Sequence, residues 1–254
     1  MKERPKVLTI AGFDPSGGAG ILADVKTLEN IKCYGLAVCT ANTIQDDKSF
    51  KSCDWIAQQY IKTQLNLLLS RFDIKTVKIG VIENWKFLNE IIDILLVSDK
   101  NMKIVLDPVL SSSTDFEFHP SEKKSLGTDF NKVLDKIYLL TPNYNEIGRL
   151  YTGKSLEESI DWISKKTNLL LKGGHKKEAI GVDELFTTDG KKFTFNPKRK
   201  KISEKHGSGC VLSSAVSGYL ALGFPLLKAC FRGKRYTEDV LSSNKNLLGY
   251  HTKK

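Results

Sequence analysis

The sequence predicts an α/β protein with an open, mainly parallel β-sheet and helices on both faces of the sheet. Short apolar runs alternate with segments of helical periodicity along the chain. This order is typical of right-handed βαβ crossovers, which place helices on both faces of a parallel sheet. The units are too few for a closed eight-fold barrel, so we expect a doubly wound, three-layer αβα architecture. Because no low-complexity linker interrupts the 254 residues, we expect one domain over residues 1–254.

The expected strands are short and strongly apolar. They are VLTIA at 7–11, YGLAVCTA at 34–41, TVKIGVI at 76–82, KIVLDPVL at 103–110, IYLLTPN at 137–143 and NLLLKGG at 168–174. A further segment, ELFTTDGKKFTF at 184–195, has two β-rich runs on either side of Asp189 and Gly190. An Asp-Gly pair in this position favours a tight turn, so the segment predicts an antiparallel hairpin at a sheet edge.

The helices are predicted from apolar residues that recur three and four positions apart. Asp54 is the expected N-cap of the second helix. We expect the apolar faces to pack against the sheet. They consist of Ile21, Leu22, Val25 and Leu28 in the first helix, Ile61, Leu65, Leu68 and Leu69 in the second, and Trp85, Leu88, Ile92 and Leu95 in the third.

The composition limits the classes of partner. Lys and Arg number 39 against 29 Asp and Glu, which gives a formal net charge of +10. This charge suits nucleic acids, acidic membrane surfaces or small polyanions such as nucleotide phosphates. The densest basic run, PKRKK at 197–201, lacks interleaved aromatic residues, so we expect a solvated loop and no nucleic-acid partner. No apolar run approaches the roughly 18 residues needed to cross a bilayer, so we expect no membrane partner.

The cysteines give no sign of a structural site. None of the five forms a CxxC pair or a Cys/His cluster with metal-ligand spacing. The pattern therefore indicates neither a zinc site nor a disulfide framework. We expect a soluble protein of the reducing cytoplasm.

A glycine-rich segment, AGFDPSGGAG at 11–20, joins the first strand to the first helix. Its glycines let backbone amides approach a ligand closely, and the start of the following helix favours an anion. The segment matches neither GxGxxG nor the P-loop pattern GxxxxGKS/T, which argues against the usual dinucleotide and P-loop proteins. A purely structural turn is the alternative. Asp24, one turn into the helix, is either a surface residue or points back toward the pocket.

The segment HGSGCVLSSAVSGYLALG at 206–223 places Gly207, Ser208 and Gly209 before a helix of small residues. Unpaired N–H groups at such a helix start form a nest for a transferring phosphoryl group, which needs mainly positioning and charge stabilisation. Cys210 lies at the start of this helix, so we expect the helix dipole to lower the pKa of its thiol toward neutrality. The alternative for Cys210 is a small buried residue without a chemical role.

Two carboxylates and a lysine follow predicted strands. Asp107 comes after IVL, Glu146 lies shortly after LLTPN, and Lys172 comes directly after NLLL. Ligands of open α/β sheets bind beyond the carboxyl ends of the strands, so these side chains should meet at one edge. Two convergent carboxylates can hold Mg²⁺ directly or through water, and Lys172 can reach nucleotide phosphates. A plain loop residue before Pro108 is the alternative for Asp107.

Six segments together resemble the hydroxymethylpyrimidine/phosphomethylpyrimidine kinase family, in order and at similar spacing. They are LTIAGFDPSGGAGILADVKT at 8–27, VKIGVI at 77–82, VLDPVL at 105–110, LLTPNYNEIGRL at 139–150, LLLKGGH at 169–175 and HGSGCVLSSAVSGYLA at 206–221. The combination of AGxDPSGGAG with HGxGC is highly specific for this family and the related pyridoxine kinases. The resemblance implies a ribokinase-like fold, ATP and Mg²⁺ as cofactors, and a homodimer. It also implies phosphorylation of 4-amino-5-hydroxymethyl-2-methylpyrimidine, and then of its monophosphate, in thiamine biosynthesis.

The resemblance implies roles for the substrate pocket and the nest. Gln45 looks like the residue that hydrogen-bonds the pyrimidine, and Asp24 and Gly12 look like lining residues of the same pocket. Residues 207–210 are similar to the family's anion hole. There Cys210 would either accept the substrate hydroxyl proton as a thiolate or position the alcohol.

The resemblance also implies roles at the nucleotide end. Asp107 and Glu146 look like the metal and phosphate-end carboxylates, and Asn143 and Lys172 look like nucleotide contacts. The chain departs from the family in the segment LSSSTDFEFH at 110–119, where a lysine-serine-glycine loop is usual, so no lid residues are assigned there. This departure bears on the second phosphorylation, which needs room and charge for the substrate's own phosphate.

Two other functions are open at this point. A kinase for pyridoxine or pyridoxal would use the same scaffold, because these alcohols have a similar ring and hydroxymethyl group. A non-catalytic basic binding protein would account for the net charge and the PKRKK run. Its affinity for nucleic acid would fall steeply with salt.

Overall fold

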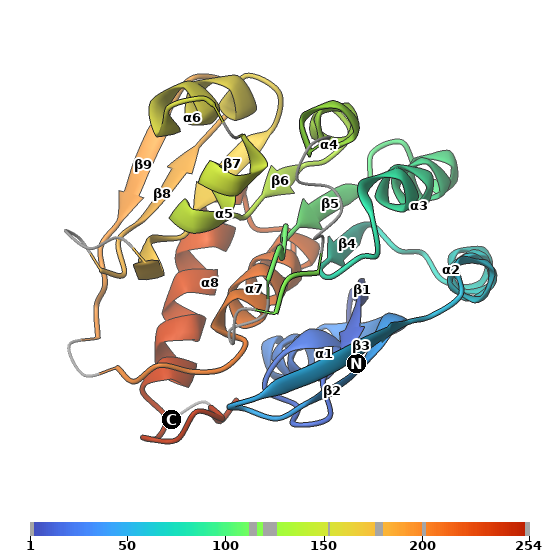
Figure 1. Cartoon of the computed structure of the whole chain (residues 1–254), viewed down its shortest axis with the longest axis horizontal. Coiled ribbons are helices and arrows are strands. Elements are labelled where there is room, and N and C mark those ends of the chain that lie inside the picture. Colours follow the sequence, from blue (N-terminus) through green and yellow to red (C-terminus); the bar gives the residue numbers. More distant parts are fainter. Residues whose placement is uncertain are drawn as a thin grey trace.

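The computed structural model describes residues 3–111, 116–118, 126–151, 153–175, 180–199 and 202–251. Within these residues, nine strands form a sheet in the order β3-β2-β1-β4-β5-β6-β7-β8-β9 (Figure 1). The strands are β1 (Lys6–Phe13), β2 (Tyr34–Gln45), β3 (Phe50–Trp55), β4 (Thr76–Ile79), β5 (Lys103–Leu106), β6 (Leu139–Leu140), β7 (Asn168–Leu171), β8 (Asp183–Phe186) and β9 (Lys192–Phe195).

Six central strands are parallel to one another, and in sheet order they are β2, β1, β4, β5, β6 and β7. The edge strands β3, β8 and β9 pair antiparallel to their neighbours. This arrangement confirms the predicted open, mainly parallel sheet. It also confirms the hairpin around Asp189 and Gly190, which β8 and β9 form at one edge.

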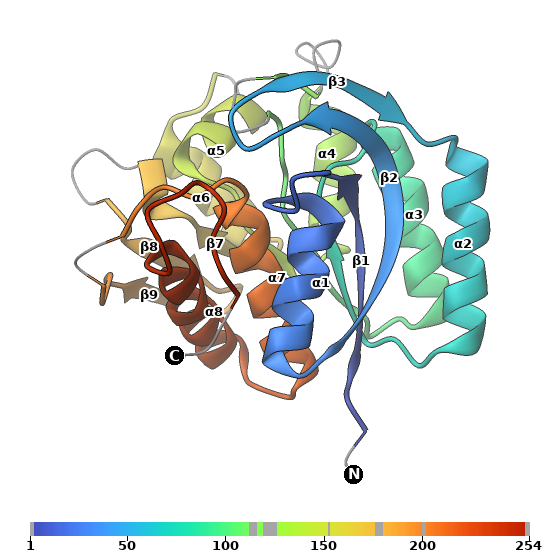
Figure 2. The same cartoon turned by 90° about the horizontal axis from the view of Figure 1, so that it is seen from below.

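The helices cover both faces of the sheet. They are α1 (Gly20–Ile31), α2 (Gln58–Arg71), α3 (Trp85–Ser98), α4 (Leu126–Leu134), α5 (Tyr144–Leu150), α6 (Leu156–Ser164), the 3₁₀ turn η2 (Gly173–His175), α7 (Ser208–Ala221) and α8 (Leu226–Leu241). Helices α1, α7 and α8 lie side by side on one face, as Figure 2 shows, and α2 to α6 cover the other face. Among the described residues, none of these helices has both the length and the apolar character needed to span a bilayer.

Side-chain alternation along the central strands explains the two helical layers. In β5, Ile104 and Leu106 belong to the core beneath α2 to α6, whereas Val105 packs with Leu212 and Val216 of α7 on the opposite face. Successive strand residues point to opposite faces, so a strand buried on both sides is apolar at every position. Continuous apolar runs such as IVL therefore identified the central strands.

The predicted start of the second helix is wrong. Asp54 is not an N-cap but an exposed residue of β3, where it pairs with Asn42 of β2. The helix begins at Gln58, after Ala57 as its N-cap. The run FKSCDW at 50–55 pairs with the long end of β2 as an edge strand, and its polar exposed residues hid this strand from a search for apolar runs.

The predicted apolar face of the first helix is only partly right, because Ile21, Leu22 and Val25 are half-buried. The buried residues of α1 are Ala23, Asp24, Thr27, Leu28 and Ile31, so the buried face shares only Leu28 with the predicted one. The reason is close packing against α7, since a Cβ added at Gly218 of α7 would lie 3.3 Å from Leu28 and 3.4 Å from Ile31. Small residues at a helix contact allow two backbones to approach. The helix α1 is therefore rotated about its axis so that Leu28 and Ile31 face α7. The predicted faces of α2 and α3 are confirmed.

Candidate active site

A cavity of about 710 Å³ lies at the carboxyl ends of the parallel strands. The candidate residues gather at this edge as expected, because most of them line the cavity. They are Gly12 of β1, Gln45 at the end of β2, Asp107 after β5, Asn143 and Glu146 after β6, Lys172 after β7, and Gly207, Ser208, Gly209 and Cys210 at the start of α7.

Asp24 lies beneath the floor of this cavity, because its side chain is fully buried and it is not among the residues that line the cavity. Its carboxylate accepts hydrogen bonds from Thr9 Oγ1 at 2.5 Å, Ser214 Oγ at 2.5 Å and Lys78 Nζ at 2.8 Å. The prediction that Asp24 lines the substrate pocket is therefore wrong. The turn of α1 that buries Asp24 points the carboxylate at Lys78, and Lys78 in turn lines the cavity.

Lys78 keeps its charge although it is buried. Burial alone would lower the pKa of the ammonium, but nearby groups, Asp24 first among them, together outweigh burial and raise the pKa above its ordinary value. The cavity floor therefore presents a fixed cation.

The loop between β1 and α1 folds around the carboxylate of Asp14. This carboxylate accepts hydrogen bonds from the amides of Ser16 at 2.9 Å and Ala19 at 2.8 Å, and lies 2.9 Å from His206 Nε2. Burial opposes ionisation, but His206, Ser16 and the amides together hold the pKa of Asp14 below its usual range. Because His206 directly precedes the nest, the contact joins the two glycine-rich segments.

Glycine is needed both where these two segments meet and inside the turn of the first segment. Gly207 is the N-cap of α7 with a φ of 72°, and a Cβ there would lie 2.1 Å from the carbonyl oxygen of Gly18. Gly20 has a φ of 57°, and a Cβ there would lie 2.1 Å from the carbonyl oxygen of Gly12. Both positions are in the left-handed region that favours glycine. The close contact sets the start of α7 against the β1–α1 loop at the cavity.

Lys172 lies between two carboxylates. Its Nζ is 2.7 Å from Asp107 Oδ1 and 3.5 Å from Glu146 Oε2. Burial opposes the charge on both carboxyl groups. At Asp107 the ammonium groups of Lys172 and Lys78 and the Ser213 hydroxyl together outweigh burial and lower the pKa, whereas at Glu146 burial prevails and raises it. Gly209 lets α7 approach this cluster, since a Cβ there would lie 3.3 Å from Lys172 Nζ.

A capping box fixes Asn143 and Glu146 at the start of α5. The amide of Asn143 donates to Glu146 Oε2 at 2.7 Å, and the amide of Glu146 donates to Asn143 Oδ1 at 2.8 Å. Each side chain thus satisfies an amide that the helix start leaves without an intrahelical partner. The pair also borders Lys172, because Asn143 and Lys172 form a parallel β-bridge.

Cys210 is half-buried and lines the cavity. Burial is the largest influence on its thiol and raises the pKa to about 11, although Lys78 and the amide of Gly20 act in the opposite direction. The prediction that the helix start lowers this pKa is wrong, because desolvation of the thiolate outweighs the dipole. At neutral pH the group is therefore a thiol.

An aromatic cluster stands beside the cavity at the β2–β3 edge. Phe50 stacks on Phe116 with ring centroids 4.3 Å apart, and Phe118 meets Phe50 edge to face at 5.5 Å. Phe118 also lines the cavity. Of the segment 110–119, where no lid residues could be assigned, residues 112–115 and 119 lie outside the described part of the chain.

Comparison with known proteins identifies the family. The chain matches the family model described as phosphomethylpyrimidine kinase over residues 14–253. A hydroxymethylpyrimidine/phosphomethylpyrimidine kinase of Aquifex aeolicus is 37% identical over 251 residues, which covers 94% of this chain and 95% of the Aquifex protein. The chain belongs to the phosphomethylpyrimidine kinase family. As a member of this family, it is a phosphotransferase.

Solved structures agree with this assignment. The phosphomethylpyrimidine kinase of Clostridium difficile 630 is 30% identical with a TM-score of 0.74, and the match covers 92% of this chain and 98% of that one. The pyridoxal kinase of Staphylococcus aureus in complex with AMP-PCP is 26% identical with a TM-score of 0.78, and the match covers 95% and 89%. The predicted ribokinase-like fold is confirmed.

The chain spans about half the length of several relatives named as bifunctional thiamine biosynthesis proteins, such as 55% of one from Methanocaldococcus jannaschii.

Sequence reasoning missed three residues that shape this kinase site. Lys78 stands inside the apolar run TVKIGVI, and a lysine in a fully buried strand signals a buried countercharge. Asp14 and His206 lie within the two glycine-rich segments and were available as candidates. Their pairing gave no signal, because they are 192 positions apart in the chain.

Replacing Gly207 with Ala should reduce kinase turnover by about 100-fold, because a displacement of reacting groups by about 1 Å has effects of this size. The added Cβ would overlap the Gly18 carbonyl and force the start of α7 away from the cavity. Gly223→Ala is the matched control, since Gly223 has a φ of 86° but open space around its Cβ position. That variant should lose about 1–2 kcal/mol of unfolding free energy and keep its turnover. Equal turnover in the two variants would contradict the close contact.

Iodoacetamide should modify Cys210 slowly at pH 8, with a rate that rises about tenfold per pH unit toward pH 10, because only the thiolate reacts. The raised pKa of about 11 keeps the thiolate scarce below that range. Peptide mass spectrometry of samples quenched over time gives the rate at this cysteine alone. A rate that levels off near pH 7 would show that the thiol has a lowered pKa.

Proposed function

We propose that the protein transfers the γ-phosphoryl group of ATP to the hydroxymethyl group of 4-amino-5-hydroxymethyl-2-methylpyrimidine, and then to the resulting monophosphate, in thiamine biosynthesis. The observation that carries the proposal is the convergence of three features in one cavity. They are the amides at the start of α7, the Lys172 ammonium, and the polar groups beside Gln45. The names of the Aquifex and Clostridium proteins point to the same substrates.

Gln45 and Gly12 would hold the pyrimidine ring. The Gln45 amide donates to Thr43 Oγ1 at 2.8 Å, and Thr43 donates to the carbonyl of Phe13 at 2.8 Å, so the side chain is oriented from β1. An oriented amide can pair with a ring nitrogen and an exocyclic amine at once. Asp24 would act indirectly, since it holds Lys78 at the cavity floor.

The nucleotide would lie along Lys172 and Asn143 with its terminal phosphoryl at the start of α7. Phosphoryl transfer asks the protein for positioning and charge stabilisation, and amides at a helix N-terminus supply both. Lys172 would add its charge where negative charge develops. The AMP-PCP complex of the Staphylococcus aureus pyridoxal kinase supports an ATP-type ligand for this cavity.

The donor set fits Mg²⁺. Magnesium usually binds through one or two carboxylates plus substrate phosphates and keeps several waters. Asp107 and Glu146 offer two carboxylates, and the described residues contain no cluster of three or more His, Cys, Asp or Glu that could hold a metal alone. These two residues would therefore hold the ion together with the nucleotide, and the ion would neutralise charge on the phosphates.

Cys210 would position the alcohol rather than act as a thiolate base. Its raised pKa keeps it protonated at neutral pH, and a thiol can donate to or accept from the substrate hydroxyl. A loose transition state asks little of a base, because bond formation to the incoming oxygen lags behind cleavage of the leaving bond.

We further propose that the chain works as one kinase domain, as a homodimer, in the cytoplasm. The cytoplasmic location is supported by the five cysteines, all of which are free thiols.

The function is tested by incubating the protein with Mg-ATP and the hydroxymethylpyrimidine and following the products by mass spectrometry. We expect one and then two added phosphoryl groups. A single addition would mean that the altered 110–119 segment has removed the second step. No addition to this alcohol would contradict the proposal.

Pyridoxine or pyridoxal is the second candidate substrate, favoured by the structural similarity to the Staphylococcus aureus pyridoxal kinase. The ratio of kcat/KM for the two alcohols separates the candidates, since it measures the difference in transition-state binding. We expect the pyrimidine to have the higher value.

A further inference from the structure

Part of the cavity wall is formed by the two described ends of the connection between β7 and β8, residues 173–175 and 180–182. The connection starts directly after Lys172. Its residues Gly174, Ile180 and Gly181 line the cavity, and so does Asp183, the first residue of β8. Its two ends are joined, because the amide of Gly181 donates to the carbonyl of Gly173 at 3.0 Å. The backbones of Gly173 and Val182 are in close contact, since a Cβ at Gly173 would lie 1.9 Å from the carbonyl oxygen of Val182.

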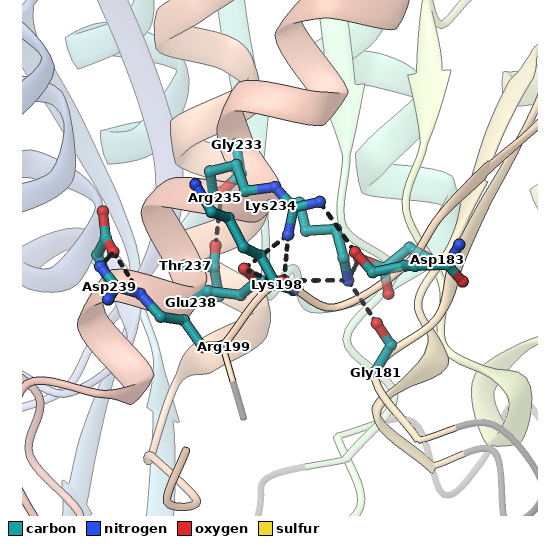
Figure 3. Close-up of polar contacts among 11 residues, drawn as sticks. Gly181, Asp183, Lys198, Arg199, Gly233, Lys234, Arg235, Thr237, Glu238 and Asp239 are labelled. Carbon is teal, nitrogen blue, oxygen red and sulfur yellow. Dashed lines mark hydrogen bonds and ion pairs between the residues drawn. The ribbon is translucent and has the colours of Figure 1, made fainter. Parts of the chain in front are cut away.

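Asp183 ties this connection to α8. One carboxylate oxygen accepts from the Gly173 amide at 2.8 Å, and the other is 2.9 Å from Lys234 Nζ. Lys234 also donates to the carbonyl of Gly181 (Figure 3). A single ammonium from α8 therefore contacts both ends of the connection, directly at Gly181 and through Asp183 at Gly173.

This ion pair is buried, with Lys234 5% and Asp183 6% exposed. Glu238, one turn along α8, does not substitute for Asp183. Its oxygen lies 3.9 Å from Lys234, and its carboxylate is engaged by Arg235 at 2.7 Å and by the amide of Lys198 at 3.1 Å. A buried carboxylate without its countercharge is strongly unfavourable. The hydrogen bond from the Gly173 amide to Asp183 therefore depends on Lys234.

We propose that Lys234 is a positioning residue that fixes the β7–β8 connection as the wall against which the nucleotide binds. The inference rests on the proposed function for the identity of the nucleotide. Lys234 is remote in sequence from every candidate residue of the site, and it acts through Asp183 and the backbone rather than on the reacting atoms. Its loss should therefore weaken nucleotide binding and leave the alcohol pocket unchanged.

The decisive variants are Lys234→Met and the double variant Asp183→Asn with Lys234→Met. The single variant leaves the Asp183 carboxylate buried and unpaired. The double variant removes both charges but keeps a side-chain oxygen that can accept from the Gly173 amide. Arg199→Met is the matched control, because Arg199 pairs with Asp239 of α8 at the exposed surface, with 49% and 52% of the side chains accessible.

For Lys234→Met we expect KM for ATP to rise about tenfold while KM for the alcohol changes less than about twofold, the split typical of lost binding to one substrate. Deuterium uptake by the 173–183 peptide, measured without substrates, should become faster. Both changes should be partly reversed in the double variant, which keeps an acceptor for the Gly173 amide but lacks the contact of Lys234 with Gly181. Arg199→Met should behave as the unmodified protein.

Two results would overturn the proposal. Unchanged deuterium uptake in Lys234→Met would show that this lysine does not hold the connection. A double variant in which deuterium uptake recovers but KM for ATP does not would show that Lys234 contacts the nucleotide itself. If the unmodified protein phosphorylates no alcohol, the proposed function fails instead, and the exchange experiment still decides whether Lys234 fixes this segment.

Discussion

The buried ion pair between Asp24 and Lys78 is the interaction on which the site depends most. Both side chains are almost completely inaccessible, at 0% and 1%. Asp24 comes from α1, Lys78 from β4, and the two hydroxyl donors to Asp24, Thr9 and Ser214, come from β1 and α7. Removing one partner of such a pair typically costs about 3–5 kcal/mol, because the other charge is left buried and unpaired. The pair therefore fixes two strands and two helices relative to one another directly beneath the cavity.

The orientation of α7 follows from this constraint. Ser214 anchors the helix to Asp24, and the preceding residue, Ser213, donates to Asp107 at 3.1 Å. The start of the helix is then set against the β1–α1 loop by Gly207 and by the contact between His206 and Asp14. Four separate contacts thus aim the N-terminus of α7 at the cavity. Preorganised amides of this kind need no rearrangement at the moment of reaction, which is the condition for strong electrostatic stabilisation.

Much of the fold could be predicted from the sequence, because its signals are local. The central strands are buried on both faces and read as continuous apolar runs, and the Asp189-Gly190 turn marks the edge hairpin. The exceptions are segments whose packing depends on distant residues. The face of α1 is set by the small residues of α7, and β3 is recognisable only from its pairing with β2.

The candidate site also divides into features with a local sequence signal and features that depend on distant residues. The placement of Asp107, Asn143 and Lys172 at strand ends follows from topology alone. The burial of Asp24 against Lys78, 54 positions away, does not, and neither does the desolvation that raises the pKa of Cys210. Charge pairs and burial arise from the tertiary fold, so a sequence pattern can name the residue without giving its ionisation state.

A crystal structure with Mg²⁺, AMP-PCP and the hydroxymethylpyrimidine bound together tests the central claim most directly. The account predicts that the terminal phosphoryl group lies against the amides of residues 207–210 and beside Lys172, with the substrate hydroxyl next to Cys210 and the ring at Gln45. A terminal phosphoryl group bound away from the start of α7, or a pyrimidine ring that does not contact Gln45, would contradict it.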